Sequence, residues 1–252
     1  MIKTTTMAAF FAVVIVSAPM NAIAGSGDDE RGYDAGRSGP EYWADISKKF
    51  ELCRDGKEQS PINISGAKTA NLPAIQFDYK PGSLEILNNG YTIQVNHAAG
   101  SSITVGEEKY ELLQFHFHTP SENTVDGKSF PMEMHLVHKN AKGQLAVVGV
   151  FSKEGAKNTV LSKAWEHTPR QAGDKEKVAS VSINAADLLP VDRSYYSFKG
   201  SLTTPPCSEG VKWMVLKMPT EVSREQIEQF IKVMGNNARP VQPMHMRTLN
   251  MM

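Results

Sequence analysis

Short apolar runs of four to seven residues, separated by glycine, proline and asparagine, recur along most of the chain. Runs of this length that are rich in β-branched and aromatic residues predict β-strands, because helices need longer patterns. Asn89-Gly90 lies between two of these runs and predicts a tight hairpin, since both residues can adopt positive φ. The predicted strands cover residues 74–79, 84–87, 91–96, 102–105, 112–118, 132–138, 145–151 and 211–216.

Helical periodicity is confined to two segments, residues 156–166 and 223–234. In the second segment, Ser223 and Gln226 have the spacing of a capping box, and Gly235 suits a helix stop. Many strands with few, peripheral helices predict one α+β domain, predominantly β, on a large, mostly antiparallel, twisted sheet. The apolar stripe of the second helix consists of Ile227, Phe230, Ile231 and Met234.

The composition is that of an ordinary globular protein, with 40% hydrophobic and 21% charged residues among 252. The 27 basic and 27 acidic residues balance, and the sequence has no basic run. Proteins that bind nucleic acid carry a basic patch, so we do not expect nucleic acid as a partner.

The first 24 residues predict a cleaved secretory signal peptide. Lys3 provides the positive start, residues 7–16 form an apolar segment, and residues 22–24 read Ala-Ile-Ala, a cleavage pattern. A membrane anchor is the alternative, but a spanning helix needs about 20 apolar residues, and Ser17 and Pro19 interrupt this one. We therefore expect a mature domain at residues 25–252, periplasmic or secreted and not attached to the membrane.

The chain contains two cysteines, Cys53 and Cys207, far apart in the sequence. In a reducing cytosol such residues would be buried thiols, whereas export favours a disulfide. A bridge would close a loop of well over a hundred residues and could contribute about 4 kcal/mol to stability. A metal site made by both cysteines is a weaker alternative, because nothing places them near the histidines.

Polar residues gather on one face of the predicted strand 112–118. Because side chains alternate across a strand, Leu112, Gln114, His116 and His118 should share that face. Two imidazoles placed two residues apart on one pleated face point toward the same region. The opposite face should belong to the core and carries Leu113, Phe115 and Phe117.

The next predicted strand supplies a third histidine. Glu133, His135 and Val137 should share one of its faces. If the two strands are neighbours in the sheet, His135 completes a site of three nitrogens with His116 and His118. Three histidines leave one position of a tetrahedral Zn²⁺ open for water, as in catalytic rather than structural sites. The opposite face carries Met134 and Leu136.

His-x-His alone is a weak indication of metal binding, because a single strand histidine is usually a surface or core residue. Gln114 and Glu133 strengthen the indication, since each could accept the far ring N–H of a ligand and fix its tautomer. The remaining histidines lack such neighbours and are predicted to be structural or on the surface: His97, His138, His167 and His245.

Seven segments match, in order, the motifs of one enzyme family. They are GPEYW at 39–43, QSPINI at 59–64, ILNNG at 86–90, HFH at 116–118, SEN at 121–123, MEMHLVH at 132–138 and GSLTTPP at 200–206. On these motifs, the sequence resembles the α-class carbonic anhydrases of the exported bacterial type. The resemblance implies a catalytic domain at 25–252 with about ten strands, peripheral helices and zinc in a central cleft.

The resemblance also implies the activity. Members of this family are zinc lyases that reversibly hydrate carbon dioxide to bicarbonate and a proton through zinc-bound hydroxide. Hydrolysis of activated esters is expected as a side reaction, and sulfonamides and anions as inhibitors. Because dimers are frequent among bacterial relatives, a homodimer is one option for this chain.

Carried over by position, the resemblance makes His116, His118 and His135 the zinc ligands, with Gln114 and Glu133 behind them. It places Thr203 where a hydroxyl accepts a hydrogen bond from the nucleophile, with Glu122 as the acceptor for Thr203, and it matches Cys53 and Cys207 to a disulfide of exported members. The apolar wall for carbon dioxide corresponds to Val137, Val147, Leu202 and Trp213, with Thr204 beside it.

The sequence departs from the family pattern at the proton-shuttle position and in the amino-terminal arm. Tyr91 follows the Asn-Asn-Gly turn, where fast members carry a histidine. Tyrosine has a pKa near 10 and is a poor relay at pH 7, so we expect proton transfer to limit turnover. Tyr33 matches the tyrosine of the family's pocket, and Arg31 stands where a tryptophan is common.

Two other functions compete with this hypothesis. A non-catalytic binding protein of the same fold would lack one or more of the zinc histidines, and all three are present. A zinc hydrolase for peptides or phosphoesters would need a further carboxylate as general base, and Glu122 is the candidate. Its expected partnership with Thr203 argues against that role.

Overall fold

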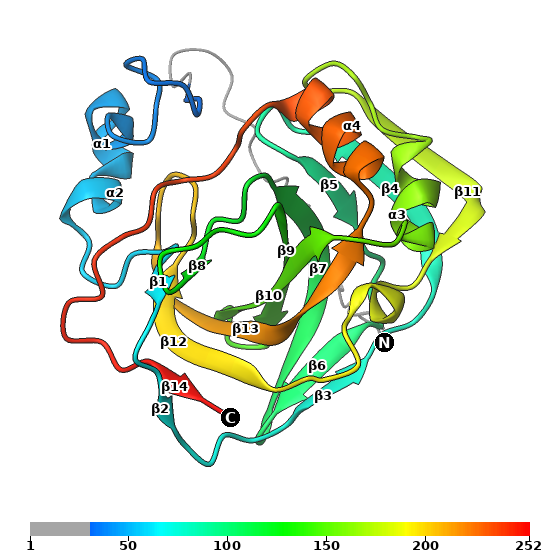
Figure 1. The fold of residues 1–252 in the computed structure, drawn as a ribbon. Coiled ribbons are helices and arrows are strands. Elements are labelled where there is room, and N and C mark those ends of the chain that lie inside the picture. The colour runs from blue at the N-terminus through cyan, green and yellow to red at the C-terminus, as the bar shows by residue number, and fades with distance from the viewer. Residues whose placement is uncertain (1–30) are drawn as a thin grey trace, which may run out of the picture.

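The computed structural model describes residues 31–252, so the predicted signal peptide at 1–24 lies outside the described residues. A strongly twisted sheet carries α3 and α4 at one side and the short α1 and α2 at the other (Figure 1). The helices are α1 (Trp43–Ile46), α2 (Leu52–Asp55), α3 (Thr159–Trp165) and α4 (Arg224–Met234), with 3-10 turns at Lys48–Phe50 and Ala185–Leu188. Among residues 31–252, no helix has the length and apolar character that a membrane crossing requires.

Twelve strands form the main sheet, and β1 (Asn63–Ile64) pairs in parallel with β8 (Thr124–Val125) outside it. The order along the sheet is β11-β4-β5-β7-β9-β10-β13-β12-β14-β2, with β6 beside β7 and β3 beside β6. Its strands are β2 (Lys68–Thr69), β3 (Ile75–Asp78), β4 (Gly82–Asn88), β5 (Ile93–Asn96), β6 (Ser102–Val105), β7 (Glu108–His118), β9 (Met132–Asn140), β10 (Leu145–Glu154), β11 (Lys175–Ile183), β12 (Tyr195–Ser201), β13 (Glu209–Val222) and β14 (Asn250–Met251).

The mostly antiparallel sheet is confirmed, since only β10–β13 and β14–β2 are parallel among its described pairs. All eight predicted strands occur, and the sheet has two strands more than the expected ten. The strand β11 escaped prediction because it lies at the edge of the sheet, begins with three charged residues and is mostly exposed, so it has no apolar run.

The strand β7 contains a bulge that corrects one sequence prediction. Leu112 is 2% exposed and lies in the core with Phe115 and Phe117, whereas Leu113 is 38% exposed. The register shifts between Leu112 and Gln114, so two consecutive side chains leave the core and the alternation is offset by one. Leu112 therefore does not share the face of the histidines, and Leu113 is not a core residue.

The hairpin between β4 and β5 is present but uses a different turn. Of its residues, only Gly90 has positive φ, at 84°. The Asn89 side chain instead accepts hydrogen bonds from the backbone N–H groups of Tyr91 and Thr92, at 3.0 and 2.9 Å. This Asx turn makes the loop longer than the predicted two-residue turn, and it places Tyr91 within the turn.

The helices α3 and α4 cover one face of the sheet through aromatic packing. The Phe117 ring lies 4.8 Å from the Trp165 ring, and Trp165 stacks on Phe230 at 5.9 Å. Burying side chains of this size contributes about 2 to 3 kcal/mol each. The predicted capping box of Ser223 and Gln226 is confirmed. Ile231, however, is 41% exposed and is not part of the buried stripe.

Candidate metal centre

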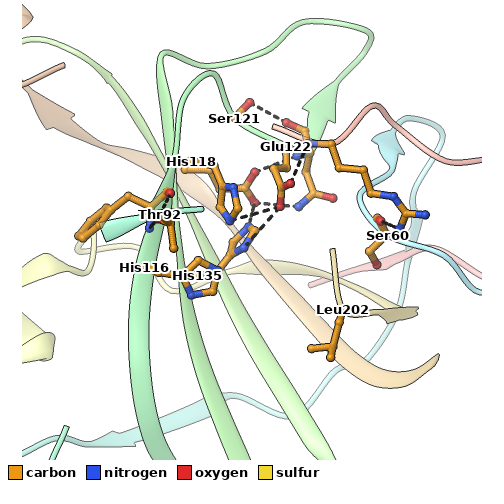
Figure 2. A network of polar contacts seen from close by, with 12 residues as sticks. Ser60, Thr92, His116, His118, Ser121, Glu122, His135 and Leu202 are labelled. Atoms are coloured by element: carbon orange, nitrogen blue, oxygen red, sulfur yellow. Dashed lines mark hydrogen bonds and ion pairs between the residues drawn. The ribbon is translucent and has the colours of Figure 1, made fainter. Parts of the chain in front are cut away.

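Three histidines from two neighbouring strands converge beside Glu122 (Figure 2). His116 on β7 faces His135 on β9 directly in the antiparallel register, and His118 lies two residues further along β7. One nitrogen from each ring lies within 4.8 Å of the others. The strands thus bring together the three residues that the sequence analysis proposed as ligands.

The far nitrogens of two rings have side-chain acceptors on the same strands. His116 Nδ1 lies 2.9 Å from Gln114 Oε1, and His135 Nε2 lies 3.1 Å from Glu133 Oε1. The acceptor at His116 Nδ1 places the hydrogen there, so His116 Nε2 keeps a free lone pair. The Glu133 carboxylate lies beside His135 Nε2, which makes no aligned hydrogen bond within residues 31–252. Gln114 and Glu133 therefore lie where a tautomer-fixing role requires them.

The third ring is held by a group that sequence reasoning missed. His118 Nδ1 lies 2.8 Å from the backbone carbonyl of Asn237, which follows α4. The Asn237 side chain also accepts from the backbone N–H of Thr119 at 2.8 Å. No sequence signal could have revealed this contact, since a carbonyl is present in every residue and the partners are 119 positions apart.

Burial keeps the three imidazoles neutral. It lowers the pKa of His118 to about 4 and the pKa values of His116 and His135 well below 6.5. Repulsion from the neighbouring histidines lowers the pKa of His116 further. His118 Nε2 is buried and has no hydrogen-bond partner within the described chain. Neutral nitrogens aimed at one point match the ligand preference of Zn²⁺, so the residues fit this metal.

Glu122 is buried beside the histidines, with 1% of its surface exposed. Its Oε2 lies 3.4 Å from His118 Nε2, and its Oε1 accepts from the backbone N–H of Arg239 at 2.9 Å. Burial raises the pKa of Glu122 to about 8, while the Arg239 N–H and the neighbouring Thr203 hydroxyl oppose that shift. The structure thus brings Thr203 and Glu122 together at the site.

Arg239 is a second residue that sequence reasoning missed. Its buried guanidinium donates to the carbonyls of Cys53 and Ser60, each at 2.7 Å, and to Gln59 Oε1 at 2.9 Å. Burial lowers its pKa to about 10, which leaves it charged at neutral pH. Arg239 therefore connects α2 and the segment after it to the backbone N–H that holds Glu122.

An apolar wall adjoins the histidines. Val147 lies between Val137 and Trp213 in the register of β9, β10 and β13, and all three are buried. The Trp213 ring meets the His135 ring edge-on at 4.9 Å. Leu202 packs against the same cluster and remains partly exposed. Four of the proposed pocket residues therefore form one surface next to the metal ligands.

The loop after β12 carries Thr203 and is fastened by a disulfide. Cys53 and Cys207 are bonded, as predicted, across 154 positions of sequence. Within the loop, the carbonyl of Thr204 accepts from the backbone N–H of Cys207 at 2.9 Å. Thr204 itself is partly exposed beside Thr203. The bridge connects this loop to α2.

Tyr91 and the amino-terminal arm lie close to the site. Asn237 donates from its side chain to the Tyr91 carbonyl at 3.0 Å, so the residue that holds His118 also holds the turn. Tyr33 packs edge-on against Trp43 at 5.6 Å. Burial raises the pKa of Tyr33 far above 10, and the negative charge of Glu122 adds to this shift.

Known proteins match the sequence and the fold of this chain. The family model of the eukaryotic-type carbonic anhydrases matches residues 38–252. A carbonic anhydrase of Pectobacterium carotovorum is 47% identical over 220 residues, covering 86% of this chain and 89% of that protein. A carbonic anhydrase of Neisseria gonorrhoeae is 42% identical over 240 residues, covering 94% of each.

The α-carbonic anhydrase of Thermovibrio ammonificans, solved with the inhibitor sulfanilamide, has a TM-score of 0.86 at 45% identity. The match covers 89% of this chain and 100% of that one. The twisted sheet thus places the chain in the class of α-carbonic anhydrase folds. The chain belongs to the α-carbonic anhydrase family, and its activity is that of a carbonic anhydrase.

Proposed function

We propose that the chain uses zinc to convert carbon dioxide and water reversibly to bicarbonate and a proton. One observation carries this proposal: His116, His118 and His135 bring one nitrogen each within 4.8 Å of the others, and an oxygen lies 2.8 to 3.1 Å from each far nitrogen. When bound, Zn²⁺ supplies Lewis-acid chemistry that makes a water molecule nucleophilic near neutral pH. Because the group has three members, a tetrahedral metal keeps one position for this chemistry.

Thr203 and Glu122 select the nucleophile. An ionised Glu122 can only accept hydrogen bonds, so the Thr203 hydroxyl must donate to it. The Thr203 oxygen then accepts a hydrogen bond only from a nucleophile that still carries a proton. Burial favours the protonated form of Glu122, whereas the positive charge of a divalent cation nearby favours the carboxylate.

The apolar wall of Val137, Val147, Leu202 and Trp213 suits carbon dioxide, which has no net dipole and makes weak hydrogen bonds. A nonpolar surface binds such a substrate without displacing strongly held water. Bicarbonate is charged and interacts poorly with this surface, so the product leaves readily. Thr204 offers a hydroxyl at the edge of the wall.

Proton removal is the slow step in this proposal. Tyr91 occupies the position from which a histidine relay would act, and a phenol does not exchange protons efficiently at pH 7. Small buffers such as imidazole should therefore accelerate hydration. Stopped-flow rates should rise with imidazole concentration and reach a plateau, and fast turnover with no response to imidazole would contradict this step.

The remaining features are proposed from the family and the sequence. Residues 1–24 direct export and are removed, so the enzyme acts in the periplasm or outside the cell. Sulfonamides bind at the metal in this proposal, which the sulfanilamide complex of the Thermovibrio ammonificans enzyme supports, and anions also inhibit. Hydrolysis of activated esters is a side activity, and a homodimer is the assembly to test first.

The decisive test combines a zinc determination with stopped-flow carbon dioxide hydration, with and without sulfanilamide. About one zinc per chain and hydration that sulfanilamide blocks is the expected result. A protein that holds zinc but is inert toward carbon dioxide would be a binding protein of this fold. Hydrolysis of peptides or phosphoesters in place of hydration would identify the rival hydrolase. The same two measurements are made on His116→Asn, which removes one of the three proposed ligands. The matched control is His245→Asn, the same change at an exposed residue.

A further inference from the structure

Arg31 connects two segments that flank the metal centre. Its Nη1 donates to the carbonyl of Pro205 at 2.7 Å, and its guanidinium carbon lies 4.2 Å from the centre of the Tyr91 ring. Pro205 follows Thr203 by two residues, and Tyr91 lies in the turn between β4 and β5. One side chain from the amino-terminal arm therefore bridges the proton-shuttle position and the Thr203 loop.

The Tyr91 end of this bridge is coupled to a metal ligand through Asn237. Asn237 donates to the carbonyl of Tyr91 and accepts from His118. The charge of Arg31 also reaches inward, since it lowers the pKa of Tyr33 while Glu122 raises it. The geometry that places Arg31 beside the site is its contact with the ring of Tyr91, whose carbonyl shares Asn237 with His118.

The positive charge of Arg31 is not neutralised within residues 31–252. Its polar contact there is a backbone carbonyl, and it forms no ion pair with a carboxylate of that part of the chain. The Tyr91 ring binds the guanidinium through its electron-rich face and supplies no net charge.

We propose that Arg31 selects solutes by charge on their way to the metal centre. It favours anions, including anionic inhibitors and anionic proton-accepting buffers, over cations. This inference rests on the proposed function, because it concerns traffic to the same zinc site. A unit charge acting over roughly 10 Å near a protein surface corresponds to an affinity difference of about three- to tenfold between an anion and a neutral analogue.

The experiment compares two benzenesulfonamides that differ in charge at the ring position opposite the sulfonamide: the 4-carboxylate and the neutral 4-carboxamide. Calorimetry on the zinc-loaded protein gives both dissociation constants for the wild type, Arg31→Gln and Arg31→Lys. Arg31→Gln should weaken binding of the 4-carboxylate about three- to tenfold and leave binding of the 4-carboxamide unchanged. Arg31→Lys should keep most of the preference, and 0.5 M salt should reduce it, because exposed charges are screened.

Equal effects of Arg31→Gln on both ligands, no effect on either, or an Arg31→Lys variant that behaves like Arg31→Gln would each overturn the inference. Three acidic residues, Asp28, Asp29 and Glu30, directly precede Arg31 in the sequence. Neutralising them with Asn, Asn and Gln is the matched control, and it should preserve or increase the preference for the carboxylate. A preference that reverses in this control would also contradict the assignment to Arg31.

A kinetic arm separates this inference from the proposed function. In the wild type, phosphate should stimulate hydration more than imidazole does. The ratio of the stimulation by phosphate to the stimulation by imidazole should fall in Arg31→Gln. An enzyme that binds both sulfonamides but does not hydrate carbon dioxide would refute the proposed function while the binding ratio still decides the role of Arg31. Failure of both sulfonamides to bind would overturn the zinc site and this inference with it.

Discussion

His138 provides a quantitative test of how burial in the sheet lowers the pKa of a histidine. It lies on β9 with no exposed surface, and its Nε2 is 2.7 Å from the Tyr79 hydroxyl. Its Nδ1 is 3.3 Å from the carbonyl of Ala146, which can only accept, so Nδ1 carries the hydrogen and Nε2 accepts from Tyr79. A second proton would need to enter at Nε2, facing another buried neutral group. Burial accordingly lowers the pKa of His138 to about 3.

The sign of the pH effect follows from this shift. An unfolded histidine has a pKa of about 6.5, so between pH 6.5 and pH 3 the unfolded chain binds a proton that folded His138 does not. The stabilising contribution is complete above pH 6.5 and is lost as the pH falls through this window. Between pH 7 and pH 5 the free energy of unfolding should decrease by about 2 kcal/mol through this one group.

Urea unfolding at pH 7 and pH 5 measures this loss. We expect His138→Gln to be less stable than the wild type at pH 7, because buried hydrogen bonds are disturbed. Its free energy of unfolding, however, should decrease between pH 7 and pH 5 by about 2 kcal/mol less than that of the wild type. The metal-free protein is used throughout, so the titration of the three metal-site histidines cancels in the comparison. His245→Asn, at an exposed residue, should reproduce the wild-type decrease. An unchanged decrease in His138→Gln would refute the reasoning.

Three further predictions concern the site and its support. Thr203→Ala should lower the hydration rate about a hundredfold or more, because an oriented hydrogen bond at the reacting atoms is lost, while zinc content, measured by atomic absorption, stays the same. Replacing Cys53 and Cys207 together by serine should cost about 4 to 5 kcal/mol in urea unfolding, given the 154-residue separation, and a loss below 1 kcal/mol would contradict that reasoning. Removing the metal with a chelator should abolish hydration and lower the melting temperature, with both restored by zinc, because a ligand of the folded state stabilises it.

Local sequence patterns were sufficient for most of the architecture. The β-rich runs predicted eight strands of the sheet, because alternation and β-branched residues report burial of one strand face directly. The capping box of Ser223 and Gln226 marked the start of α4 for the same reason, since its hydrogen bonds join residues three positions apart. The grouping of His116 with His118 likewise needs only the period of a strand.

Other features depend on contacts between distant parts of the chain. The bulge in β7 moves Leu113 out of the core, and it arises from pairing with β9 rather than from the residues around it. The carbonyl of Asn237 and the guanidinium of Arg239 reach the site from the segment after α4. Neither could be found from spacing, because the path of the chain decides which backbone groups arrive there.

Sequence alone thus determined the residue types of the metal centre, the strands that carry them and the cysteines that pair. The tertiary structure decided how each imidazole is oriented, which groups surround Glu122, and that Arg31 bridges Tyr91 and Pro205. The physical reason is the range of the interactions. Periodicity and capping act within a few residues, whereas burial, ring tautomers and electrostatic coupling depend on groups that only folding brings together.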